Sequence, residues 1–144
     1  MTPDYQKIVQ AMNLIAKKCG GGKLNKMKAI KLLYFADRYH LRKYGRPLVF
    51  DNYFAMKQGV VGETAKDVVY ASDFLDDDAR LYSYEYIKPV GEHDFKSLRG
   101  IDEDVFSETD KEAIEFSVKN FGHYDQFQLA DITHAYPEWN KFEK

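Results

Sequence analysis

Cysteine is nearly absent from this sequence. Cys19 is the single cysteine among 144 residues, so the chain cannot close an intramolecular disulfide. No other cysteine or histidine stands near Cys19 at the spacing of zinc ligands, which argues against a structural zinc site. A lone thiol is typical of a reducing compartment, and we therefore expect a cytoplasmic protein.

Long uncharged apolar runs are also missing. No stretch approaches the roughly 18 residues that a membrane-spanning helix needs, so we expect no membrane insertion. The N-terminal segment MTPDYQKIVQ lacks the charged start, apolar middle and cleavage site of a secretory signal, which argues against export. A length of 144 residues suits one domain, residues 1–144, whose core is large enough to fold without a metal or a disulfide.

Catalytic motifs are the third absence. The sequence contains no GxSxG or HExxH motif, and no active-site motif surrounds Cys19. His134 follows Asp131 by three residues, a spacing at which a carboxylate can orient an imidazole on a helix, but no nucleophile or metal ligand accompanies the pair. His134 is better explained as a packing residue near Trp139. We therefore expect no enzymatic activity.

The net charge of -2 hides a strong segregation of charge along the chain. Residues 1–50 carry eleven Lys and Arg against two Asp and Glu, whereas residues 51–144 carry ten against twenty-one. A basic half of this kind can mark a surface for nucleic acid or for an acidic partner. The alternative is that the two halves neutralise each other when the chain folds.

Helical periodicity with start and stop signals dominates the sequence. Thr2-Pro3-Asp4 is typical of a helix start, the glycines at 20–22 predict a turn, and Gly45 predicts the end of a long central helix. A capping box at 107–110 predicts a further helix start. The predicted helices span about 2–18, 24–44 (with residue 25 as the alternative start), 63–73, 108–121 and 125–134.

The remaining segments favour short strands and turns. Branched and aromatic residues predict a strand within 48–58, and alternating aromatic and polar residues predict another over 81–89, paired with 94–99 across Gly91. Turns are expected at 59–62 and at the acidic triplet 76–78. The sequence therefore predicts an α+β fold, a mainly helical single domain with a small antiparallel β-sheet.

The central helix offers both a core and a candidate binding surface. Its apolar residues fall on two flanks: Met27, Ile30, Leu33, Tyr34, Leu41 and Tyr44 on one, and Leu32, Phe35 and Tyr39 on the other. Asp37 lies within the first flank and needs a hydroxyl, an amide or an arginine as its partner.

Basic side chains run between these two apolar flanks. Lys31, Arg38 and Arg42 form a strip beside Phe35 and Tyr39, a mixture typical of protein interfaces. The 22 aromatic residues exceed what an ordinary core requires, which also favours an aromatic contact surface. The alternative is pairing with the acidic half, and it applies more to Lys31 and Arg38 than to Arg42.

Two segments together resemble the Panacea domain family. They are KLLYFADRYHLRKYGRPL at 31–48, continuing into YFAMKQG at 53–59, and LADITHAYPEW at 129–139. The family comprises SocA-like and GepA-like antitoxins of bacterial and phage toxin–antitoxin systems. One departure is Val60, where relatives commonly have proline. The motif-matched positions are Lys31, Leu32, Leu33, Tyr34, Asp37, Tyr44, Gly45, Pro47, Thr133, His134, Pro137 and Trp139.

The resemblance implies a cofactor-free antitoxin that neutralises a cognate toxin protein by direct contact. It also implies a variant mode, in which the antitoxin is an adaptor that delivers its toxin to an ATP-dependent bacterial protease. A nucleic-acid-binding regulator that uses the basic half is the second hypothesis, although no helix-turn-helix is evident. The candidate partner-binding residues are Lys31, Phe35, Arg38, Tyr39, Arg42, His134 and Trp139.

Overall fold

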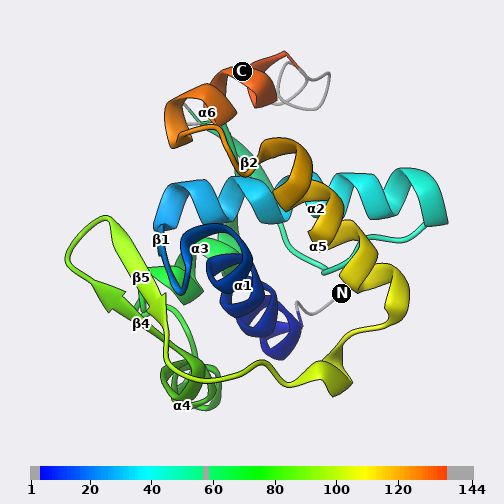
Figure 1. The fold of residues 1–144 in the computed structure, drawn as a ribbon. Coiled ribbons are helices and arrows are strands. Elements are labelled where there is room, and N and C mark those ends of the chain that lie inside the picture. The colour runs from blue at the N-terminus through cyan, green and yellow to red at the C-terminus, as the bar shows by residue number, and fades with distance from the viewer. Residues whose placement is uncertain (1–3, 57–58, 136–144) are drawn as a thin grey trace.

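Two long helices form the centre of the fold (Figure 1). The computed structural model describes residues 4–56 and 59–135, in which α1 (Tyr5–Gly20) packs against α2 (Lys26–Tyr44). Asp4 caps α1, because its carboxylate accepts from the Lys7 amide. The cap therefore lies later than the predicted Thr2-Pro3 start, and those two residues lie outside the described ranges.

The central helix α2 has the predicted ends. Asn25 caps its start by accepting from the Lys28 amide, and Gly45 ends it in a left-handed conformation with φ of 80° that favours glycine. Helices α1, α5, α6 and α3 and strand β3 all contact α2. The predicted apolar flank is correct where these elements cover it and wrong in the last turn, where Leu41 and Tyr44 are exposed.

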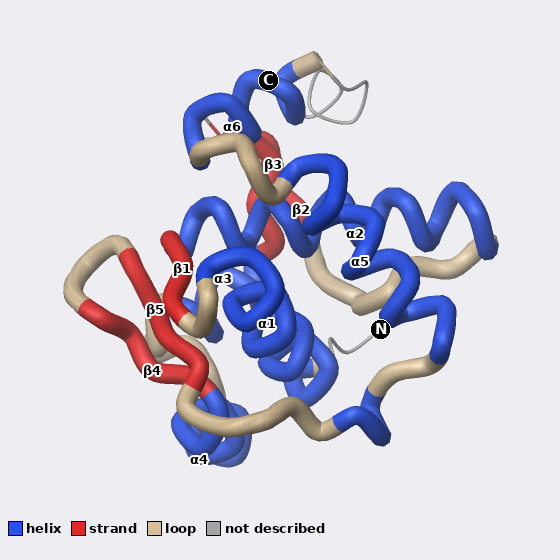
Figure 2. The backbone as a smooth tube through the Cα atoms, viewed as in Figure 1, coloured by secondary structure: helices blue, strands red, loops and turns tan. Residues whose placement is uncertain are grey.

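A three-stranded antiparallel sheet lies beside α1 in the order β1-β5-β4, as Figure 2 shows. Strands β4 (Ile87–Val90) and β5 (Asp94–Ser97) pair across the turn at Gly91, as predicted. Strand β1 (Lys23–Asn25) was not predicted, because only its pairing with β5 makes this short segment a strand.

The segment from Asp77 to Tyr86 is helix α4, which corrects the predicted strand over 81–89 and the predicted acidic turn. Asp76 caps α4 by accepting from the Ala79 amide, and the acids after it lie near the positive end of the helix dipole. Tyr82 and Tyr86 are four residues apart, so the same aromatics that alternate along a strand also share one helix face. Tyr82 packs edge-on against Tyr5 of α1.

A separate hairpin of β2 (Tyr53–Met56) and β3 (Gly59–Gly62) precedes α3 (Glu63–Val69). The predicted strand is confirmed in its second half, but the predicted turn at 59–62 is the partner strand. Val60 lies opposite Ala55 in this ladder, at the position where relatives commonly have a proline. Helix α3 is shorter than the predicted 63–73.

The C-terminal half contributes two helices and a 3₁₀ turn. The turn η1 (Glu103–Val105) leads to α5 (Glu108–Phe121), which starts with the predicted capping box between Ser107 and Asp110, and α6 (Gln126–His134) follows. In Figure 1, α5 lies alongside α2 and α6 lies above it. The mainly helical α+β single-domain fold is therefore confirmed.

Candidate functional site

A surface groove runs between the C-terminal half of α2 and the C-terminal half of α5. Its cavity has a volume of about 390 Å³. Four of the predicted partner-contact residues line it, together with three that the sequence did not single out. The lining residues are Phe35, Arg38, Tyr39, Arg42, Lys43, Phe116 and Phe121.

Two stacked aromatic pairs form the apolar part of the groove. Phe35 and Phe121 stack with their ring centroids 4.2 Å apart, and Tyr39 stacks on Phe116 with centroids 4.1 Å apart and planes within 7° of parallel. Phe35 is buried, whereas Phe116 is 38% exposed. Each pair joins one ring from α2 to one from α5, so the groove exists only because the two helices pack together.

A carboxylate network holds one rim of the groove. Glu112 of α5 accepts from the hydroxyls of Tyr39 and Tyr44, each at 2.6 Å, and from the ammonium of Lys43 at 2.8 Å. The Lys43 ammonium and the two hydroxyls lower the pKa of Glu112 to about 2. Tyr39 is therefore fixed twice, by the stack on Phe116 and by the bond to Glu112.

The cations of the groove differ in their surroundings. Lys43 is neutralised by Glu112. Arg38 is half-buried, one helical turn before Arg42. Arg42 is exposed and forms no ion pair with any residue in the described part of the chain. The guanidinium of Arg42 is thus available to a partner at the groove.

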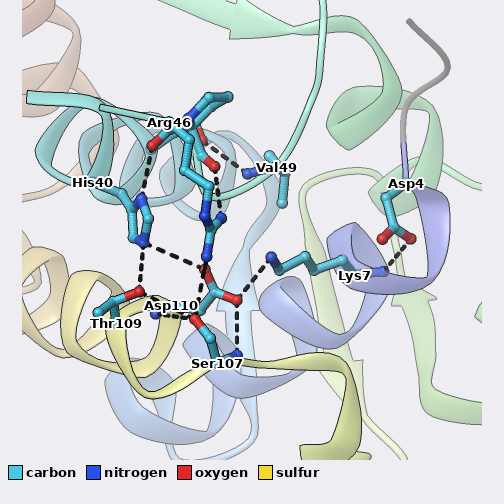
Figure 3. Close-up of polar contacts among 10 residues, drawn as sticks. Asp4, Lys7, His40, Arg46, Val49, Ser107, Thr109 and Asp110 are labelled. Atoms are coloured by element: carbon cyan, nitrogen blue, oxygen red, sulfur yellow. Dashed lines mark hydrogen bonds and ion pairs between the residues drawn. The ribbon is translucent and has the colours of Figure 1, made fainter. Parts of the chain in front are cut away.

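The α5 wall is positioned by a buried carboxylate, Asp110, which Figure 3 shows between three helices. Asp110 accepts from the ammonium of Lys7 in α1 at 2.7 Å, from the guanidinium of Arg46 after α2 at 3.3 Å, and from the amide of Ser107 at 2.9 Å. Burial raises the pKa of Asp110, but Lys7 and the Ser107 amide outweigh it, so the pKa lies below its usual value.

A buried histidine adds a second link between α2 and α5. The Nδ1 atom of His40 donates to the Arg46 carbonyl at 2.7 Å, and its Nε2 atom lies 2.8 Å from the Thr109 hydroxyl and 3.5 Å from the Asp110 carboxylate (Figure 3). Further along the same interface, the Ser117 hydroxyl donates to the Leu32 carbonyl at 2.6 Å. These bonds hold the two helices together beneath the groove.

Lys31 does not belong to an exposed strip, and that prediction is wrong. Its side chain is fully buried, because several elements surround α2 at this position, and its ammonium has no hydrogen-bond partner among the described residues. Burial lowers the pKa of Lys31 to about 8. Lys31 is therefore an internal cation rather than part of the groove.

Of the two C-terminal candidates, only His134 lies within the described residues. His134 is half-buried in the last turn of α6, and the groove residues do not include it. Trp139 and Pro137 lie outside the described residues.

The basic and acidic halves neutralise each other in part, as the sequence alternative proposed. Four ion pairs join cations of the first half to carboxylates of α5: Lys7–Asp110, Lys18–Glu115, Lys43–Glu112 and Arg46–Asp110. The positive charge of residues 1–50 is thus directed toward α5 as well as toward solvent.

Asp37 has the predicted kinds of partner. Its carboxylate accepts from the Val49 amide at 2.9 Å and from the Tyr53 hydroxyl at 2.7 Å. Burial raises the pKa of Asp37, and these hydrogen bonds only partly offset that effect. Asp37 thereby fixes the connection from α2 to β2.

Residues 4–56 and 59–135 contain neither a candidate metal site nor a candidate membrane-spanning helix. No group of three or more His, Cys, Asp or Glu side chains there is arranged to hold a metal ion. No helix in these ranges is both long and apolar enough to span a membrane.

A comparison with protein families gives one match. The family model described as "Antitoxin SocA-like, Panacea domain" matches residues 30–140, which contain both helices of the groove from Ile30 onward. Searches of curated proteins and of solved structures found no match.

Proposed function

This chain belongs to the SocA-like antitoxin family that is defined by the Panacea domain, and we propose that it neutralises a cognate toxin by direct protein–protein binding in the cytoplasm. The observation that supports this proposal is the α2–α5 groove, a preformed surface with stacked aromatic rings and the exposed guanidinium of Arg42. Neutralisation by contact needs no catalytic group and no cofactor.

The composition of the groove suits a protein partner. Aromatic residues and arginine are enriched among the few side chains that carry most of the binding energy in interfaces. Tyr39 and Phe116 are already fixed by stacking, so little side-chain entropy is lost when a partner binds. The groove therefore combines the right residue types with a rigid arrangement.

Co-expression with the product of the neighbouring gene tests the proposed function. If that product is the toxin, it stops growth when expressed alone, and growth returns when this chain is present. The two purified proteins then form a complex in size-exclusion chromatography. A toxic neighbour that still arrests growth in the presence of the folded chain, and does not bind it, would overturn the proposal.

Two modes of neutralisation are compatible with direct binding. Sequestration blocks the toxin and leaves its lifetime unchanged or longer, whereas delivery to an ATP-dependent protease shortens it. Toxin half-life in cells with and without this chain, measured in parallel in a strain that lacks the protease, distinguishes the two modes. We propose sequestration as the basic mode, because a binding surface alone is sufficient for it.

Nucleic-acid binding is the second candidate function, because Arg38 and Arg42 accompany aromatic rings in the groove. The ion pairs with α5 occupy four of the cations that a phosphate backbone would otherwise attract. Binding of this kind would weaken steeply as salt increases. Titration with single- and double-stranded oligonucleotides at several salt concentrations tests it.

A further inference from the structure

We infer that the α2–α5 groove recognises a toxin segment in which a carboxylate side chain lies next to a large aromatic or aliphatic side chain. This inference rests on the proposed function and specifies the chemistry of the partner. It follows from how charge and apolar surface are distributed over the groove residues.

The charge of the groove favours an anionic group near Arg42. Glu112 accepts three hydrogen bonds, from Lys43, Tyr39 and Tyr44, and its carboxylate neutralises the positive charge of Lys43. Arg42 lies on the same helix face as Arg38 and is not neutralised by the described residues. A guanidinium binds a carboxylate through two parallel hydrogen bonds, which fixes the orientation of the partner.

The apolar part of the groove favours a bulky side chain beside that carboxylate. Phe116 is 38% exposed, although it stacks on Tyr39 through one ring face. Its remaining surface, with the edges of the Phe35–Phe121 pair, borders a cavity of about 390 Å³. This volume is near the lower end of the roughly 300–1,000 Å³ of small-ligand pockets, so it accepts side chains of a short segment.

A peptide segment fits these features better than a nucleic acid. Single-stranded nucleic acids need several cations along the backbone and free ring faces for base stacking. In this groove one face of each of the four rings is already taken by its stacking partner, and the charge of Lys43 is paired with Glu112. A peptide with one carboxylate and one apolar side chain can bind Arg42 and cover the exposed surface of Phe116.

Selection from a random peptide library displayed on phage tests the inference, because it does not require the toxin to be identified. The full chain is the bait, and we expect enrichment of peptides that carry Asp or Glu next to Phe, Trp, Tyr or Leu. Calorimetry then measures the affinity of an enriched synthetic peptide. Arg42→Glu should weaken this affinity about tenfold or more, as reversal of an interface charge typically does.

A matched charge reversal on another part of the molecule is the control. Lys96→Glu also reverses one positive charge, and Lys96 is exposed on β5, a strand that Figure 1 shows apart from the C-terminal halves of α2 and α5. This variant should keep peptide affinity within about twofold, as expected for a surface residue outside the interface. A melting temperature for each variant shows whether it is folded. If Arg42→Glu does not fold, Phe116→Ser, which also removes a groove contact, replaces it.

Several results would overturn the inference. One is enrichment of basic or purely apolar peptides, and another is equal affinity of the wild type and Arg42→Glu for the enriched peptide. Tight binding of a fluorescent oligothymidine would overturn it if Arg42→Glu abolished that binding. Self-association of the chain that Arg42→Glu abolished would overturn it as well. The proposed function is tested separately by the neighbouring gene product. If Arg42→Glu still neutralises that toxin fully, the inference fails and the function stands. If no neighbouring product is toxic but acidic–aromatic peptides bind, the function fails and the groove assignment stands.

Discussion

Leu33 and Leu41 have the same chemistry and lie on the same helix, but only one of them contributes to the core. Leu33 is 1% exposed, whereas Leu41 is 51% exposed in the last turn of α2. Leu33→Ala should therefore lower the free energy of unfolding by roughly 2–5 kcal/mol, because truncation leaves a cavity. Leu41→Ala is the control and should change it by less than about 0.5 kcal/mol. Urea denaturation of the two variants measures both values. Similar losses of stability would show that Leu33 is not more buried than Leu41.

Lys31 is a buried cation without a hydrogen-bond partner in the described ranges, and such a group opposes folding at neutral pH. Lys31→Met keeps the apolar stem and removes the charge. We expect it to raise the free energy of unfolding by about 1–3 kcal/mol at pH 7, the scale found when buried charges are replaced by apolar side chains. Lys17→Met, at an exposed position of α1, is the control and should have little effect.

The pH dependence of the Lys31→Met effect provides an independent test. The pKa of Lys31 falls from 10.5 to about 8 on folding, so the folded state loses the proton first as pH rises. The stability of the wild type should therefore increase relative to Lys31→Met between about pH 8 and pH 10. Chemical denaturation at a series of pH values measures this difference. A constant difference would contradict the assignment of the effect to the charge of Lys31.

At the scale of elements, α3 depends on a cap that comes from outside the helix. Gly62 precedes α3 and offers no side chain, and instead Asp51 accepts from the amides of Thr64 and Ala65 at 2.8 and 2.9 Å. A Cβ atom at position 62 would lie 2.6 Å from the Asp51 carboxylate. Glycine at 62 therefore permits the close approach on which the cap depends.

Gly62→Ala should displace the Asp51 carboxylate and cost about 1–2 kcal/mol, the usual value of a lost N-cap. The amides of Thr64 and Ala65 should also exchange faster with deuterium. Gly100→Ala is the control, because no atom lies within 4 Å of a Cβ there. Equal stability of the two variants would mean that α3 does not require the Asp51 cap.

The boundaries of the elements were predictable where the signal is local. Gly45 at the end of α2, and the box from Ser107 to Asp110 at the start of α5, act through their own backbone neighbours, and the sequence predicted both correctly. The start of α2 was predicted to within two residues. The segment that forms α4 was predicted as a strand, because Tyr82, Tyr84 and Tyr86 alternate with other residues as in a strand. Tyr82 and Tyr86 are also four residues apart, which is the spacing of a helix face. Strand β1 depends on β5, which lies far along the chain, so no local pattern could predict it.

At the scale of the whole molecule, the groove was predictable only on one side. Phe35, Arg38, Tyr39 and Arg42 share a face of one helix, which periodicity identifies. The opposite wall is formed by Phe116 and Phe121, five residues apart on α5, and their contact with α2 is tertiary. The segregation of charge did indicate that the two halves meet, and the ion pairs to α5 confirm this alternative for four cations.

Two of these ion pairs join α1 to α5 at the same distance but in different surroundings. Lys7–Asp110 and Lys18–Glu115 are both 2.7 Å long, yet the side chain of Asp110 is 1% exposed and that of Glu115 is 63% exposed. Loss of a buried carboxylate leaves a cation without its partner in a place that water reaches poorly. The two pairs should therefore differ greatly in their contribution to stability.

Asp110→Asn should lower the free energy of unfolding by about 3 kcal/mol or more, because Lys7 and Arg46 lose a shared buried carboxylate that links three segments. Glu115→Gln should change it by less than about 1 kcal/mol, as for an exposed ion pair.

Asp110 also positions the α5 wall of the groove. Asp110→Asn should therefore weaken peptide binding at the groove even below the unfolding temperature of the variant, and Glu115→Gln should not. Denaturation and peptide calorimetry on both variants measure these effects. Equal losses in the two variants would show that the buried network does not fix α5 against α1 and α2.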